Sequence, residues 1–245
     1  MVSRAVEAVA VGAAGGLLGA LTGRLVGELV DLESELALVG AVVGGLNGVG
    51  SGWRRVYGWR EVRGPIAFVL DSTWSLVMTT TGVIANLYAW VVPGSGYVPE
   101  LSERQNLHVH RKGLVVRRGY AVTFGHVVDG AGDVELPRRR RLVTDHEDVH
   151  AWQARWWGPL FPVLLGAWFV GGSATGVLVW LARGRREPLR AVVETTGYYM
   201  NPYEYWAYSR HGIWRPSGMV DGIGWRRPWV ASRESLRRRT GRTAA

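Results

Sequence analysis

The sequence contains no cysteine, which excludes disulfide bonds and thiolate zinc ligands. Any metal site must therefore be built from histidine and carboxylate side chains. Charge is also scarce, because 20% of the residues are charged whereas 47% are hydrophobic. Lysine is almost absent: Lys112 is the only lysine among 29 basic residues, so arginine carries the net charge of +9.

The arginines are clustered. Arg138 to Arg141 form one run, and five more lie near the carboxyl end of the chain, namely Arg233, Arg237, Arg238, Arg239 and Arg242. Basic clusters close to long apolar segments are attracted to anionic lipid headgroups. Membrane lipid is therefore the expected partner of these clusters, and nucleic acid is the less favoured alternative.

Glycine is abundant and regularly spaced near the amino end. Residues 5–22 and 36–50 are apolar, and glycine recurs at every fourth position in and just after the first segment, at Gly15, Gly19, Gly23 and Gly27, and within the second, at Gly40, Gly44 and Gly48. This spacing makes a flat helix face that lets two backbones approach closely in lipid. It predicts a membrane-associated glycine-zipper hairpin over residues 1–65. Each arm is shorter than the ~20 residues of a full span, so shallow insertion or assembly into a homo-oligomer is favoured as strongly as two crossings.

Two further apolar segments, 66–92 and 156–182, are long enough to cross a bilayer as helices. Asp71 is the only charge in the first, and its sequence context favours a helix N-cap over a functional group within the membrane. The second contains no charge but has Pro162 and the Gly171-Gly172 pair as helix breakers. These breakers predict a kinked span or a re-entrant pair of short helices.

Between residues 106 and 128 the pattern changes to short apolar runs separated by glycine, which predicts a small antiparallel β element. His108 and His110 alternate onto one face of a strand. Metal binding is one reading, but an exposed polar pair on a half-buried strand is favoured.

The most specific motif is His146-Glu147-Asp148-Val149-His150. On a helix its two histidines lie one turn apart on the same face, where both can bind one zinc ion. Thr144 and Glu147 have the spacing of a capping box, which predicts a helix that begins near Asp145. The same box allows a non-catalytic reading, in which Glu147 only caps the helix.

A zinc site with two histidines needs a third protein ligand, and Glu204 is the best candidate. Asn201 is a plausible N-cap, Pro202 suits the first helical position, and Gly212 suits the position after the last turn. Glu204 would then lie in the first turn of this helix. Glu187 and Glu194 are weaker candidates, because proline or glycine flanks them.

The H-E-x-x-H motif followed by a glutamate on a separate helix resembles the gluzincin class of zinc metallopeptidases. The longer string from His146 to Gln153 looks like the H-E-x-x-H-x-x-Q variant of bacterial gluzincin-like domains, and Asn201-Pro202-Tyr203-Glu204 is similar to a motif of membrane proteins in that group. The resemblance covers about residues 100–210.

The resemblance implies that His146, His150 and Glu204 bind Zn²⁺ and that Glu147 is the general base. It also implies a donor that stabilises the oxyanion, for which Tyr208 and His211 are the candidates. The sequence departs from the class at one point, because the usual aspartate a few residues after the third ligand is absent.

The proposed ligands impose a condition on the membrane topology. If residues 156–182 crossed the bilayer once, His150 and Glu204 would lie on opposite sides. A shared ion therefore requires this segment to be re-entrant, to form a hairpin broken at Gly171-Gly172, or to be buried in protein.

Together these patterns predict a mainly α, membrane-associated protein with a small antiparallel β element, in the α+β class. The hairpin of residues 1–65 would precede a gluzincin-like module at 66–215, and a poorly ordered basic tail would occupy 216–245. The expected function is hydrolysis of a peptide or protein substrate at a bacterial cell membrane. The alternative is a non-catalytic glycine-zipper protein that oligomerises or perturbs the bilayer.

Overall fold

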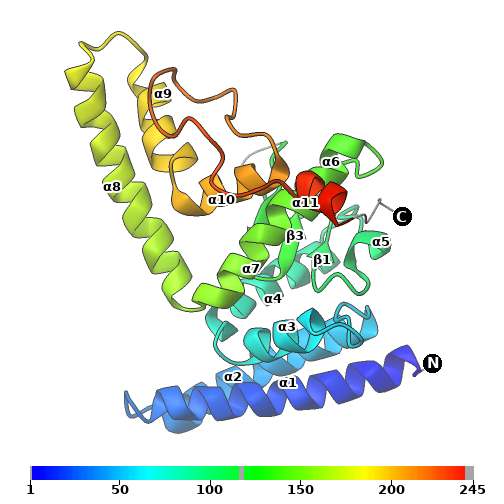
Figure 1. Ribbon diagram of the computed structural model, residues 1–245. Helices are drawn as coiled ribbons and strands as arrows, with labels where there is room; N and C mark the ends of the chain where they lie inside the picture. The colour runs from blue at the N-terminus through cyan, green and yellow to red at the C-terminus, as the bar shows by residue number, and fades with distance from the viewer. Residues whose placement is uncertain (1, 116–118, 241–245) are drawn as a thin grey trace. The chain divides into compact units, whose positions relative to one another are not determined.

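The computed structural model describes residues 2–115 and 119–240, and the chain divides into two compact units, Met1–Pro159 and Leu160–Ala245 (Figure 1). The predicted α+β composition is confirmed, since the described residues are mainly helical with one three-stranded sheet. The first unit contains the long helices α1 (Arg4–Gly27), α2 (Glu33–Trp53), α3 (Arg63–Ser72) and α4 (Leu76–Val91), the short helices α5 (Pro99–Ser102) and α6 (Pro137–Arg141), the π-helix η1 (Leu142–Glu147) and helix α7 (Asp148–Trp157).

Helices α1 and α2 lie side by side and form the predicted hairpin (Figure 1). Their glycines face each other. A Cβ atom on Gly15 would lie 2.5 Å from the carbonyl oxygen of Gly44, and one on Gly19 would overlap the carbonyl of Gly40. The neighbouring atoms are backbone atoms, which cannot rotate away. The four-residue spacing therefore lets the two backbones touch within one chain, and this face of each helix is occupied inside the hairpin.

Segment 66–92 is not one straight helix. Helices α3 and α4 meet at residues 73–75 with a bend of 93°. The N-cap expected at Asp71 is wrong, because Asp71 lies in the last turn of α3 and is 1% exposed. Its carboxylate instead accepts hydrogen bonds from Arg155 and Tyr57, so tertiary contacts determine its role.

The small sheet contains β1 (His108–Val109), β2 (Val122–Phe124) and β3 (Val127–Asp129) in the order β1-β3-β2. Strands β2 and β3 are antiparallel, as predicted, whereas β1 pairs in parallel with β3. Part of the expected strand that follows Gly113 lies outside the described residues. The edge strand β2 contacts α7, so the sheet supports the helix that carries His150.

The helix of the H-E-x-x-H motif begins earlier than the capping box predicts. Helix α6 starts at Pro137 and continues through η1 into α7 without a break. Thr144 is therefore inside a helix, and its hydroxyl donates to the neighbouring Asp145 carboxylate rather than to a free backbone amide. Glu147 has no capping role, so the expected helix start near Asp145 is wrong.

The second unit contains α8 (Leu160–Ala182), α9 (Leu189–Glu194), the π-helix η2 (Thr195–Tyr199), α10 (Pro202–His211) and α11 (Arg233–Arg239). Helix α8 is continuous through Gly171 and Gly172, so the break expected there is wrong. Gly172 instead allows a close approach, because a Cβ atom at this position would lie 2.8 Å from the carbonyl oxygen of Thr196. The chain turns after α8 and packs back against it through α9 and η2.

Three described helices are long and apolar enough to cross a membrane, namely α1, α2 and α8. The bent pair α3 and α4 would add a fourth crossing if it acted as one broken span. Large apolar side chains such as Leu17, Leu38 and Val170 are exposed on the three long helices. Exposed apolar surface of this extent is typical of contact with lipid or another protein.

The glycine contact in the hairpin gives a testable prediction. Replacing Gly19 with alanine should separate α1 from α2 and lower the free energy of unfolding by about 1–3 kcal/mol, as overpacking does elsewhere. Gly45→Ala is the matched control, because the nearest atom to its new Cβ would lie 3.9 Å away. Thermal unfolding in detergent, followed by circular dichroism, should show a lower midpoint only for Gly19→Ala. Equal midpoints would contradict the packing described.

Candidate metal centre

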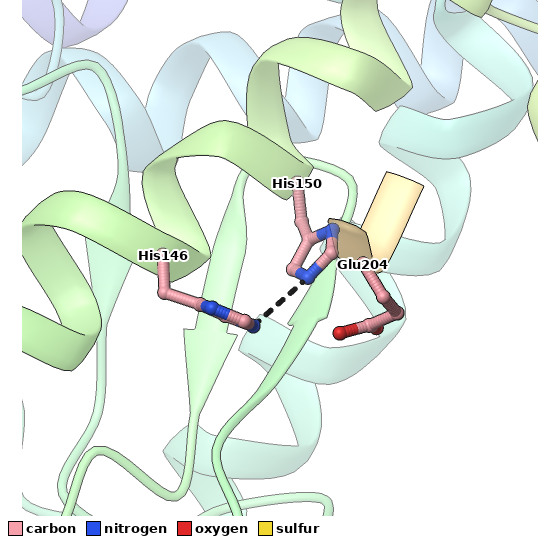
Figure 2. A group of neighbouring side chains, drawn as sticks. All are labelled: His146, His150 and Glu204. Atoms are coloured by element: carbon pink, nitrogen blue, oxygen red, sulfur yellow. Dashed lines mark hydrogen bonds between the residues drawn. The ribbon is translucent and has the colours of Figure 1, made fainter. Parts of the chain in front are cut away.

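The two histidines of the motif lie side by side within the first unit (Figure 2). The Nε2 atoms of His146 and His150 are 3.2 Å apart, and the ring centroids are separated by 4.9 Å. Two nitrogens that bind one zinc ion at ~2.0–2.1 Å must lie within about 4.2 Å of each other. The pair therefore has the spacing that a shared ion requires, and both rings present Nε2.

Gln153 fixes the orientation of the second histidine. Its Oε1 atom lies 2.8 Å from Nδ1 of His150, and since a carbonyl oxygen only accepts, the imidazole must donate from Nδ1. In a neutral imidazole the lone pair is then on Nε2, the atom that faces His146. Such a hydrogen bond behind a ligand orients the ring and raises its basicity. The sequence indicates Gln153 only as part of a family-like string and does not predict its role behind His150.

Glu147 is buried beside the histidines, and Thr123 of β2 holds its carboxylate. The Thr123 hydroxyl donates to Oε2 of Glu147 over 2.6 Å, and Glu147 is 4% exposed. Sequence reasoning missed Thr123, because the contact joins residues 24 positions apart across the sheet. The π-helix η1 contains the first two residues of the motif, His146 and Glu147. Such π-helical turns are frequent at functional sites.

Within the second unit, α10 has the predicted boundaries. The Asn201 side chain accepts a hydrogen bond from the Tyr203 amide over 3.0 Å, and Pro202 is the first helical residue. Gly212 ends the helix in the left-handed conformation, with φ of 78°. Glu204 therefore lies in the first turn, as expected.

Tyr208 and His211 follow Glu204 at positions i+4 and i+7, so all three share one face of α10. The hydroxyls of Tyr208 and Tyr198 are 3.5 Å apart. Burial and the nearby Glu204 carboxylate raise the pKa of Tyr198, so this phenol keeps its proton and can donate to Glu204. The sequence did not predict a role for Tyr198, because this residue lies in η2, outside the two motifs that suggested the site.

The donor set can be compared with the requirements of a metal. Among the described residues, His146, His150 and Glu204 make up a group that could hold a metal ion, with one donor atom from each (Figure 2). Two imidazole nitrogens and one carboxylate oxygen are a set that zinc uses in catalytic sites. The other expected carboxylates, Glu187 and Glu194, do not belong to this group.

Comparison with known proteins gives no match to a family model, to a curated protein or to a solved structure.

Three other histidines form a second cluster in the first unit, away from the motif. His108, His110 and His126 are each at most 1% exposed, so the expectation that His108 and His110 are exposed is wrong. The Nε2 atom of His108 lies 3.0 Å from the Ser51 hydroxyl, and that of His110 lies 3.1 Å from the Asn86 side-chain oxygen. These bonds connect the sheet to α2 and α4.

The buried cluster disfavours protonation. Burial lowers the pKa of His126 to about 4, and burial together with the charge of Arg54 lowers the pKa of His110 to about 4. Burial also lowers the pKa of His108, with the neighbouring His126 adding to the effect. Burial acts oppositely on a carboxyl group and raises the pKa of Asp129 to about 7.

These shifts predict acid sensitivity. In the unfolded chain His110 and His126 bind protons as the pH falls below about 6.5. In the folded chain the same two side chains stay neutral until about pH 4. The free energy of unfolding should therefore fall between pH 6.5 and 4, by on the order of 3 kcal/mol for His126 alone. His126→Leu should flatten this fall in thermal melts recorded from pH 7 to 4.

Asp129 supplies the control with the opposite sign. Between its ordinary pKa and about 7 the folded chain holds a proton that the unfolded chain releases, so this carboxyl group favours folding as the pH falls. Asp129→Asn removes that contribution and should make the loss of stability steeper. Identical pH profiles for the wild type and both variants would contradict the assignment.

Proposed function

We propose that this protein is a membrane-associated zinc metallopeptidase that hydrolyses peptide bonds. The observation that carries the proposal is the arrangement around the motif: two imidazoles with Nε2 atoms 3.2 Å apart, and a buried carboxylate on the residue after His146. A capping role for Glu147 would explain neither feature. The resemblance of the motif to gluzincins gives the reaction class.

In this proposal His146, His150 and Glu204 hold the zinc ion. Gln153 acts through His150 by accepting a hydrogen bond from its Nδ1–H group, and Tyr198 acts through Glu204 by donating a hydrogen bond to its carboxylate. Both are positioning residues. When bound, zinc supplies a Lewis acid that activates a water molecule and polarises the scissile carbonyl.

Glu147 serves as the general base, taking a proton from the attacking water at its carboxylate and passing it to the leaving amine. The hydrogen bond from Thr123 to Oε2 orients this carboxylate. Tyr208 and His211 are the proposed donors to the developing oxyanion, because they lie on the same face of α10 as Glu204.

The membrane part of the proposal rests on the apolar helices α1 and α2 and on the arginine clusters. Helix α8 does not cross the bilayer in this proposal, because a single crossing would place His150 and Glu204 on opposite sides. Arg138 to Arg141 lie in α6, where none of them is buried, and they can contact anionic headgroups. A bacterial cell membrane is the proposed location. A hydrophilic peptide or protein segment near the bilayer surface is the proposed substrate.

A second candidate function is favoured by the hairpin itself. Its inner faces are packed through glycine, and apolar side chains such as Leu21, Val42 and Leu46 are exposed on its outer faces. Such a hairpin could perturb a bilayer or assemble with further copies without any chemistry. In that case the histidine pair would hold a metal without turnover.

Metal content tests the ligand set. Protein that is purified in detergent, stripped with a chelator and reloaded should contain about one zinc ion per chain by elemental analysis, because three side chains and one open position form a catalytic site. His150→Ala and Glu204→Ala should each lose most of the zinc. Glu194→Ala is the matched control and should keep it. Full zinc content in Glu204→Ala would contradict the assignment of the third ligand.

Glu147→Gln separates a catalyst from a metal-binding scaffold. The amide has nearly the same shape but cannot accept a proton, so cleavage of a detergent-compatible casein or peptide library should fall by at least about 10²-fold. Zinc content should stay at the wild-type level. If the variant cleaves as fast as the wild type, Glu147 is not the base.

A further inference from the structure

The first unit carries a groove that has no role in the proposed hydrolysis. The groove has a volume of about 850 Å³ and runs beside the first turns of α1. Val6, Ala10 and Ala14 form one wall, since residues four apart share a helix face, and Phe68 of α3 contributes to the other. This volume falls within the usual ~300–1,000 Å³ range of small-molecule sites.

One end of the groove is apolar. From Val6 to Ala14 the helix rises ~12 Å, which is close to the ~15 Å thickness of one hydrocarbon leaflet. Small side chains at positions 10 and 14 leave room beside the backbone, and both residues are exposed. The shape and the apolar lining suit one extended acyl chain.

The other end is charged, and most of its charged side chains form ion pairs with one another. The Glu7 carboxylate is 9% exposed and accepts hydrogen bonds from Arg104 over 2.7 Å and from the indole of Trp59 over 2.8 Å. Arg55 lies 3.7 Å from Glu7 and 3.9 Å from Glu103. Arg60 and Glu61, also at the groove, make no ion pair with any part of the chain that the structure describes.

We propose that this groove binds a phospholipid with a zwitterionic, amine-bearing headgroup, such as phosphatidylethanolamine. Arg60 binds the phosphate, Glu61 binds the ammonium group, and one acyl chain lies along Val6, Ala10 and Ala14. The three arginines and three glutamates that line the groove sum to zero charge, which favours a neutral headgroup over an anionic one. Trp59 is 38% exposed at the charged end, where an indole matches the headgroup region of a bilayer.

The proposal rests on the membrane association argued above and is independent of zinc. Native mass spectrometry of the full chain, delipidated in detergent, can count bound lipids during titration with phosphatidylethanolamine or phosphatidylglycerol of the same acyl chains. One phosphatidylethanolamine should bind in preference to phosphatidylglycerol. Glu61→Gln should reduce that preference by roughly two- to fivefold, the range of an exposed ion pair.

Ala14→Leu fills the apolar end of the groove and should reduce binding of both lipids. Ala13→Leu is the matched control, because residue 13 is exposed but does not line the groove. Equal binding of the two lipids, or equal loss in both leucine variants, would mean that only unspecific annular lipid is present and would overturn the proposal. The zinc content of the same samples separates the two proposals, since loss of lipid preference with zinc retained refutes only the lipid site.

Discussion

A buried ion pair between Arg155 and Asp71 is the constraint on which the first unit depends. Arg155 is 0% exposed, and its Nε and Nη2 atoms donate to the two Asp71 oxygens over 2.9 and 2.8 Å. Nη2 also donates to the backbone oxygen of Asn106 over 2.5 Å. Removing one partner of such a pair typically costs about 3–5 kcal/mol, because a charge is left buried without compensation. Helix α7, which carries His150, is therefore fixed against α3 and against the segment that enters β1.

The same carboxylate begins a chain of hydrogen bonds that reaches the glycine hairpin. Tyr57 donates to Asp71, Asn47 of α2 donates to Tyr57, and Ser51 donates to Asn47, each over 3.0–3.1 Å. Ser51 then contacts His108 on β1. The hairpin and the motif helix thus share one buried polar network, although more than 100 residues separate Asn47 from Arg155. Among the described residues, Nη1 of Arg155 and Nδ1 of His108 are buried without a hydrogen-bond partner, so the network is only partly satisfied.

How much the sequence could predict depended on whether the deciding contacts were local. The boundaries of α10 follow from Asn201, Pro202 and Gly212, whose preferences act within a few residues, and they were predicted correctly. Glycine spacing likewise predicted the hairpin. The capping signal at Thr144 predicted the wrong helix start, because such a signal depends only on neighbouring residues. The helix begins at Pro137, seven residues earlier. Asp71, His108 and Thr123 acquire their roles from partners across the fold, which no local pattern reveals.

The central claim is that two imidazoles and one carboxylate bind zinc. X-ray absorption at the zinc edge of the reloaded protein in detergent tests it most directly. The account predicts two imidazole nitrogens and light-atom oxygen ligands at ~2.0–2.2 Å in four- or five-coordinate geometry. The Glu204→Ala variant should lose zinc or replace the carboxylate with solvent. A wild-type spectrum without imidazole scattering, or with six oxygen ligands only, would contradict the account.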